Sequence, residues 1–198
     1  MSDVYLYSFK GKFRLFDIES FLLKTELPQL VEQVAEGTRV GLKVIVPNPG
    51  NITYIRPLIV KKILDFIKGL GALVELVDTL DIMDEGLEVM KRVNHVGYSF
   101  QTFDAPFLLA DHITGTDYKE IIINGDYLPY VHLGTEFEEM GLLVFLTHFT
   151  GDPFYGYFGS ITHMALRCIA KEFKNKVLAD LVFEVDGSRC DKCGLCVE

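Results

Sequence analysis

Residues 39–77 carry a strand, a helix and a second strand in immediate succession. A β-rich stretch occupies residues 39–46, helical periodicity follows over residues 54–70, and residues 73–77 are again apolar. A succession of this kind joins two parallel strands through a right-handed crossover. The unit therefore predicts an α/β fold with a mostly parallel sheet and flanking helices.

Elements further along the chain extend this pattern. Residues 142–147 form a nearly continuous apolar run, which is typical of a central strand covered on both faces. Residues 160–174 are predicted as one helix and residues 181–185 as a closing strand. With 198 residues in all, we expect an α/β domain over residues 1–187 and a separate segment over residues 188–198.

Charge and hydropathy exclude two classes of partner. A net charge of −9 and a pI near 5.0 argue against a protein that binds the phosphates of nucleic acids. The longest apolar runs are far shorter than the roughly 20 residues that a membrane span needs. Because no secretory signal opens the chain, we expect a cytoplasmic protein without a membrane partner. A homo-oligomer remains possible.

The cysteine-rich segment predicts an iron–sulfur site. Cys190, Cys193 and Cys196 form a C-x2-C-x2-C run, the spacing with which bacterial ferredoxins hold a cubane cluster. The fourth ligand of a 4Fe–4S cluster is missing from this run, so we expect the start of a truncated ferredoxin-like segment. A zinc site would also need a fourth ligand, from Cys168 or a histidine. A disulfide framework is disfavoured because three of the four cysteines lie together.

A second candidate site is the loop at residues 47–51, between the first predicted strand and the helix after it. In this position free backbone amides and the helix dipole favour an anion, so Asn48, Gly50, Asn51 and Thr53 are candidate cofactor-binding residues. Thr53 could cap the helix. The alternative is that the loop is only a connection, because it lacks a known nucleotide-binding motif.

Two histidines are candidate ligands for a divalent metal. His148 follows the apolar run, and His163 opens the next helical region. With Asp152, they could bind a metal or transfer protons at the rim of the sheet. The alternative is local hydrogen bonding of each ring. Lys43 lies within the first strand and is expected to point to solvent, and Cys168 is expected to be a small buried hydrophobe.

An ordered series of short motifs gives the chain a family resemblance. The motifs are Gly41-Leu42-Lys43-Val44, the run at residues 49–57, Gly71-Ala72, Asp78-Thr79, Ala110-Asp111 with Gly115, the run at residues 147–151, Tyr157-Phe158-Gly159 and the cysteines. Over roughly residues 40–198 the chain resembles the DUF362 family of proteins with 4Fe–4S centres. The resemblance implies an α/β domain followed by a ferredoxin insert, within which this chain would end.

The chain departs from the family pattern at two places. It has His148-Phe149-Thr150-Gly151-Asp152 where the family pattern is His-Phe-Lys-Gly-His, and residues 159–164 replace a stretch that contains a lysine. An activity that depends on those lysines is therefore not expected here.

Together these features predict an iron–sulfur protein with a redox or electron-transfer function and an unidentified ligand site on the α/β domain. Its partner would be a redox protein or a small-molecule ligand. No catalytic residue can be assigned from the sequence, and whether the protein is an enzyme stays open. The main alternative is a non-redox anion- or metal-binding protein, or a degenerate paralogue, in which the cysteine segment is vestigial.

Overall fold

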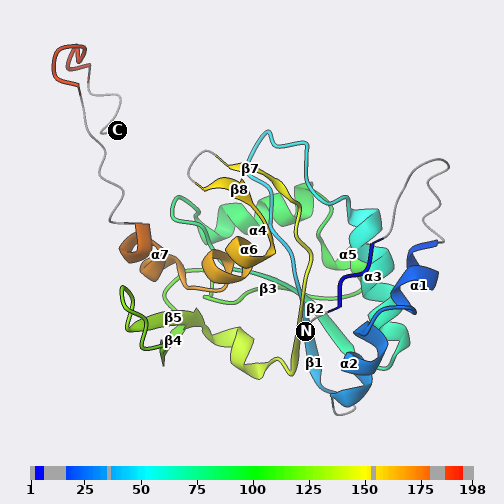
Figure 1. The fold of residues 1–198 in the computed structure, drawn as a ribbon. Helices are drawn as coiled ribbons and strands as arrows, with labels where there is room; N and C mark the ends of the chain where they lie inside the picture. The colour runs from blue at the N-terminus through cyan, green and yellow to red at the C-terminus, as the bar shows by residue number, and fades with distance from the viewer. Residues whose placement is uncertain (1–2, 7–16, 35–36, 153–154, 179–185, 194–198) are drawn as a thin grey trace.

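Figure 1 shows the fold in a computed structural model that describes residues 3–6, 17–34, 37–152, 155–178 and 186–193. The helices are α1 (Asp17–Leu22), α2 (Leu27–Gln33), α3 (Pro57–Gly69), α4 (Gly86–His95), α5 (Phe100–Phe103), the 3-10 helix η1 (Thr135–Glu139), α6 (Ser160–Arg167) and α7 (Lys171–Leu178). The strands are β1 (Arg39–Lys43), β2 (Leu73–Asp78), β3 (Phe107–Leu109), β4 (Tyr118–Ile122), β5 (Tyr130–Gly134), β6 (Leu142–Phe145), β7 (Thr150–Asp152) and β8 (Gly156–Phe158).

The main sheet is parallel, as the sequence predicts. Its strand order is β3-β2-β1-β6, and every pairing within it is parallel. The chain moves outward from β1 to β2 and β3, and then returns to place β6 on the other side of β1. The direction of winding therefore reverses between β1 and β6, where open α/β sheets commonly bind ligands at the carboxyl ends of their strands.

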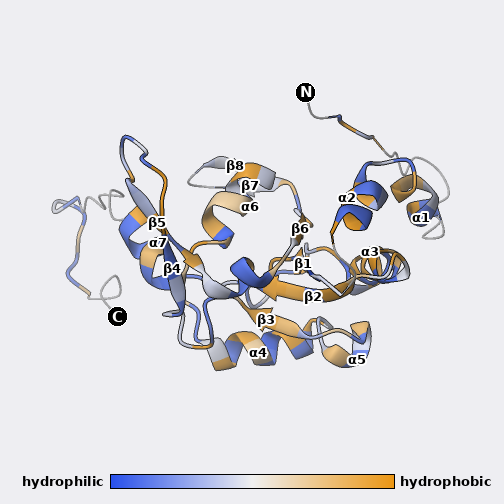
Figure 2. Ribbon diagram, turned by 90° about the horizontal axis from the view of Figure 1, so that it is seen from below, coloured by the Kyte–Doolittle hydropathy of each residue, from blue (hydrophilic) through white to orange (hydrophobic). Residues whose placement is uncertain are grey.

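The predicted α/β fold with flanking helices is confirmed, and the two faces of the sheet have different cores. Val40 and Leu42 of β1 pack with Val60 and Leu64 of α3 in the larger cluster, where all four side chains are fully buried. A smaller hydrophobic cluster contains Val77 of β2 together with side chains from η1 and β6. Figure 2 shows α4 and α5 on one side of the sheet and α6 with the β7–β8 hairpin on the other.

Two predicted elements differ from the structure. The apolar run at residues 142–147 is not a central strand: among the described strands β6 pairs only with β1, and its four residues are half-buried. The helix predicted over residues 160–174 is divided into α6 and α7, because Ile169 bridges to Leu133 and the Ala170 amide donates to the His132 carbonyl. The predicted strand at residues 181–185 lies outside the described residues.

The first residue of α4 leaves no room for a side chain. A Cβ on Gly86 would lie 2.0 Å from the carbonyl oxygen of Ile113, whereas one on Gly69 at the end of α3 would meet nothing within 4 Å. We expect Gly86→Ala to lower the free energy of unfolding by about 1–3 kcal/mol, because backbone must move. Gly69→Ala should leave it unchanged or raise it by less than about 1 kcal/mol. Urea unfolding of both variants tests this, and equal effects would contradict it.

None of the helices in the described part of the chain is long and apolar enough to cross a membrane.

Candidate functional site

A pocket lies at the carboxyl edge of the sheet, where the direction of winding reverses. It has a volume of ≈ 170 Å³ and is lined by residues that follow β1, among them Val46, and by residues that follow β6, among them Leu146. Its polar lining includes Asn48, Asn51, Thr53, His148, Thr150, Asp152 and Arg167. Two candidate sites that are distant in the sequence, the loop after β1 and the segment after β6, therefore face one cavity.

The loop after β1 is held by its own side chains. Oδ1 of Asn51 accepts hydrogen bonds from the Thr53 amide at 2.8 Å and from the Thr53 hydroxyl at 2.9 Å. Thr53 therefore does not cap α3, contrary to prediction: the residue before this helix is Arg56, and Pro57 begins it. Asn48 and Asn51 also line a second cavity on the other side of the loop, and Gly50 lines only that one.

The two candidate histidines have different environments. His148 is exposed and lines the pocket together with Asp152, whose Oδ1 accepts the Tyr155 amide at 2.8 Å. His163 is fully buried, and its Nδ1 lies 2.7 Å from the hydroxyl of Thr147. Burial lowers the pKa of His163 to about 3, so the ring is neutral at physiological pH. The structure thus brings His148 to the loop and places His163 in the interior.

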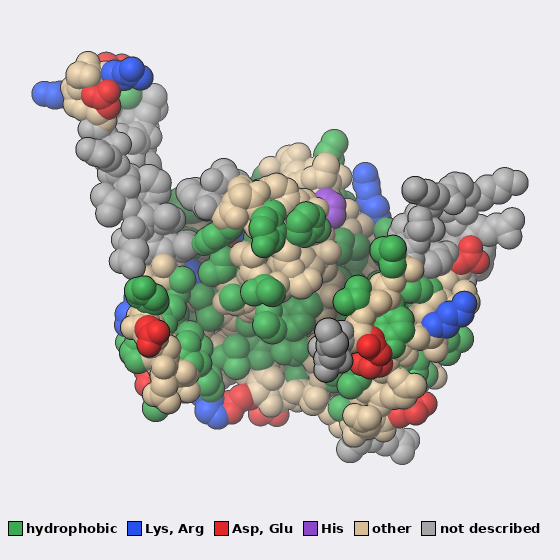
Figure 3. All heavy atoms as spheres, in the orientation of Figure 1, with side chains coloured by type: hydrophobic (Ala, Val, Ile, Leu, Met, Phe, Trp, Pro, Cys, Tyr) green, Lys and Arg blue, Asp and Glu red, His purple; other side chains and the backbone are tan. Residues whose placement is uncertain are grey.

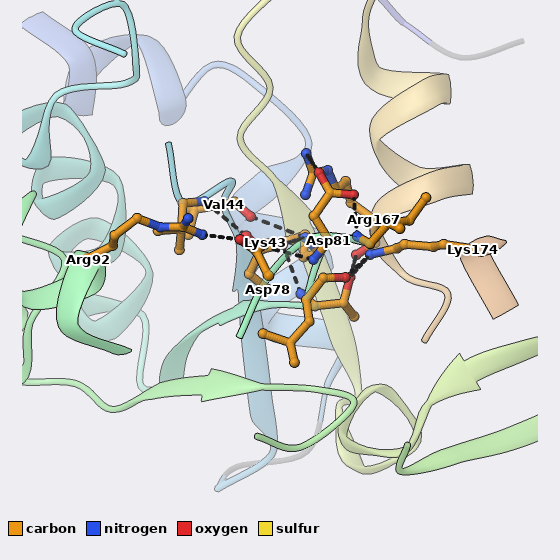
Figure 4. Close-up of polar contacts among 12 residues, drawn as sticks. Lys43, Val44, Asp78, Asp81, Arg92, Arg167 and Lys174 are labelled. Atoms are coloured by element: carbon orange, nitrogen blue, oxygen red, sulfur yellow. Dashed lines mark hydrogen bonds and ion pairs between the residues drawn. The ribbon is translucent and has the colours of Figure 1, made fainter. Parts of the chain in front are cut away.

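A buried ion pair lies at the ends of β1 and β2. Lys43 is fully buried, contrary to the expectation that it points to solvent, and its Nζ lies 2.6 Å from Oδ1 of Asp78 (Figure 4). Oδ2 of Asp78 accepts the Val46 amide at 2.9 Å, which fixes the start of the loop that lines the pocket. Burial would raise the pKa of Asp78, but the charges of Lys43 and Arg167 outweigh it and lower that pKa below its usual value.

Arg167 is a pocket residue that the sequence did not suggest. It ends α6, lines the pocket and forms an ion pair with Asp81 at 2.8 Å (Figure 4). Its carbonyl accepts the Thr79 hydroxyl at 3.0 Å, so α6 is tied to the residue after β2. A guanidinium in a pocket with amide and hydroxyl groups suits an anionic or polar ligand.

Lys174 and Asp111 are two further buried charged residues near the ends of the strands. Nζ of Lys174 donates to the Thr79 hydroxyl at 2.8 Å, and burial lowers the pKa of Lys174 to about 8. Asp111 follows β3, is fully buried and accepts the amides of Leu80 and Lys171. Burial raises the pKa of Asp111 despite these bonds. Both residues connect strand ends to α7 and do not line the pocket.

Hydrophobic rings face outward beside the pocket. Phe149 and Tyr157, from the β7–β8 region, are 70% and 60% exposed, and their ring centroids lie 5.5 Å apart. Ile161 and Met164 of α6 continue the exposed apolar surface, and Figure 3 shows hydrophobic side chains gathered on this face. Apolar surface of this kind is typical of contact sites.

The cysteines fall into two environments. Cys168 is buried, as predicted for a small hydrophobe, and burial raises the pKa of its thiol. Cys190 and Cys193 are exposed and free, and Cys196 lies outside the described residues. Among the residues that the structure places, no three His, Cys, Asp or Glu side chains are grouped so that they could hold a metal ion.

Comparison with known proteins returned one relationship. Residues 40–181 match the family described as domain of unknown function DUF362. No curated protein and no solved structure matches the chain.

Proposed function

The chain belongs to the DUF362 family, and from this membership we propose that it is an iron–sulfur protein whose α/β domain binds a small polar ligand. Electrons would pass between that ligand and a redox partner through a cluster held by Cys190, Cys193 and Cys196. The cytoplasm, where thiols stay reduced, suits such a site.

One observation carries the proposal: Cys190 and Cys193 are exposed free thiols with two residues between them. Lys192 between them has a φ of 60°, and the Cys193 amide donates to Oδ1 of Asp191 at 3.1 Å. Thiolates are the ligands that iron–sulfur clusters use, so these residues fit the group in kind. The three cysteines of this segment leave a 4Fe–4S cluster one ligand short. Cys168 is not suited to be the fourth ligand, because it is buried and its raised thiol pKa disfavours the thiolate. The remaining ligand would come from another chain or further sequence.

The pocket supports the ligand-binding part of the proposal. Its place at the winding reversal of a parallel sheet is the usual ligand position in such folds. Arg167 lines it with a guanidinium that also pairs with Asp81, while Asn48 and Asn51 supply amide groups that can orient a polar ligand. An iron–sulfur cluster, when bound, supplies one-electron transfer. The exposed rings of Phe149 and Tyr157 offer an apolar contact surface for a partner.

Iron analysis of cysteine variants tests the proposal. Protein prepared without oxygen is expected to be brown and to contain iron and acid-labile sulfide, and Cys190→Ser is expected to lose most of both because one thiolate is removed. Cys168→Ala is the matched control and should retain them, since Cys168 is buried in the domain.

Two results would contradict the assignment. Equal iron content in the Cys190→Ser variant and the unaltered protein would show that these thiols do not hold the metal. Colourless protein with stoichiometric zinc would instead support the non-redox alternative.

A further inference from the structure

A second cavity lies between the loop after β1 and the carboxyl-terminal half of α4. This loop–α4 groove has a volume of ≈ 610 Å³, larger than the pocket at the carboxyl edge of the sheet. One wall is the loop, including Pro49 and Gly50, and the other is α4 up to Val96. The loop lies between this groove and the pocket at the carboxyl edge of the sheet, which we call the edge pocket. Asn48 and Asn51 of the loop line both cavities.

Positive side chains from two different elements line the groove. Arg56 precedes α3, whereas Lys91 and Arg92 belong to α4, as does His95. In a chain of net charge −9, this concentration of cations is a local exception. Arg92 lies in the last turn of α4, where a positive charge also offsets the helix dipole, but Arg56 lies outside α4 and has no such role.

The carboxylates near the groove do not neutralise all of these cations. Glu88 lines the groove and pairs with Lys91 at 2.6 Å, and Asp84 pairs with Arg92 at 2.6 Å. Arg56 forms no ion pair with any described residue, and its guanidinium carbon lies 5.6 Å from the ring centroid of Tyr54. Nε of Arg92 is buried and has no hydrogen-bond partner among the described residues. The groove therefore retains an unpaired charge and an unused buried donor.

The loop and the apolar lining complete the site. Gly50 has a φ of +80°, and no atom lies within 4 Å of the place where its Cβ would be, so the backbone is open there. Ile52, Tyr54 and Val96 provide apolar contacts for the uncharged part of a ligand. Guanidinium groups suit phosphate oxygens because they can donate two parallel hydrogen bonds.

We propose that the loop–α4 groove binds the phosphate group of a small phosphorylated ligand through Arg56, Lys91 and Arg92. This site is distinct from the edge pocket and does not depend on the cysteine segment. Its cations converge from the residue before α3 and from α4 on a recess large enough for more than the phosphate group alone.

Titration with inorganic pyrophosphate tests the groove. We expect calorimetry on the full chain to detect binding, and we expect Arg56→Gln and Lys91→Gln each to weaken it about tenfold by removing a charged hydrogen-bond donor. Both side chains are exposed, so the fold should survive their replacement. Lys61→Gln is the control, because it removes the same charge from the exposed side of α3, outside the groove.

Two results would overturn the proposal. One is the absence of pyrophosphate binding at millimolar concentration. The other is an equal loss of affinity in Lys61→Gln, which would assign the effect to overall charge. Iron content should be measured on the same variants. Arg56→Gln and Lys91→Gln should leave it unchanged, so a failure of pyrophosphate binding is distinguishable from a failure of the proposed iron–sulfur site.

Discussion

Replacement of Lys43 by methionine is expected to lower the free energy of unfolding by about 3–5 kcal/mol. The side chain of Lys43 is fully buried and that of its partner Asp78 is 3% exposed, so the variant leaves a carboxylate in the interior without its counter-charge. Asp78 also accepts the amides of Val46 and Thr79, and the change should therefore loosen the loop that lines the edge pocket.

Two further variants separate charge from packing. Lys43→Met combined with Asp78→Asn removes both charges, so it should recover part of the lost stability. The recovery should be incomplete, because the two oxygens of Asp78 each accept a backbone amide and the amide nitrogen of asparagine cannot accept one. Lys61→Met breaks an exposed pair of similar length, Lys61–Asp65 at 2.9 Å, and should cost less than about 1 kcal/mol. Chemical denaturation of the variants measures these differences. If Lys43→Met costs no more than Lys61→Met, the buried pair does not stabilise the fold as described.

The second large effect is a loss of stability in acid that depends on His163. Burial lowers the pKa of this imidazole from 6.5 to about 3, which means that the folded protein binds the proton less readily than the unfolded chain. The stability from the neutral ring is complete above pH 6.5 and is lost as the pH falls towards 3. Between pH 7 and pH 5 the expected loss is on the order of 2 kcal/mol.

A glutamine at position 163 tests this dependence because it keeps a hydrogen-bonding group for Thr147 but does not titrate. Whatever its stability at pH 7, His163→Gln should show a smaller fall in unfolding free energy between pH 7 and pH 5. His148→Gln is the control, since His148 is exposed, and it should keep the slope of the unaltered protein. A slope unchanged in His163→Gln would mean that another group causes the acid response. Asp78, whose pKa is lowered, acts only at lower pH, where its carboxylate begins to protonate.

The strand–helix–strand unit was predictable because local signals and burial agree there. β1 and α3 lie within the predicted ranges, and β2 extends one residue beyond its predicted range, to Asp78. The helical periodicity places Val60, Leu64 and Ile67 on the face that packs against the sheet. The position of the edge pocket was also foreseeable in part. Asn48, Asn51 and Thr53 follow one parallel strand and His148 follows another, and the carboxyl ends of parallel strands share one edge.

Other features depended on contacts that no local pattern records. An apolar run such as that of β6 is compatible with a central strand and with an edge strand. Only the pairing with neighbouring strands determines which of the two positions it takes. The break between α6 and α7 follows from the pairing of Ile169 with Leu133, which overrides the helical preference of the sequence.

The sequence alone determined the α/β class, the family membership and the thiol spacing, because these reside in residue order and periodicity. The tertiary structure decided that Lys43 is buried against Asp78, that His163 is an interior ring and that Arg167 reaches the edge pocket. The physical reason is that strand alternation determines which face of the sheet a side chain lies on. It does not determine which segments of the chain cover that face. The covering segments here, α6 and α7, come from more than 100 residues further along the chain than Lys43.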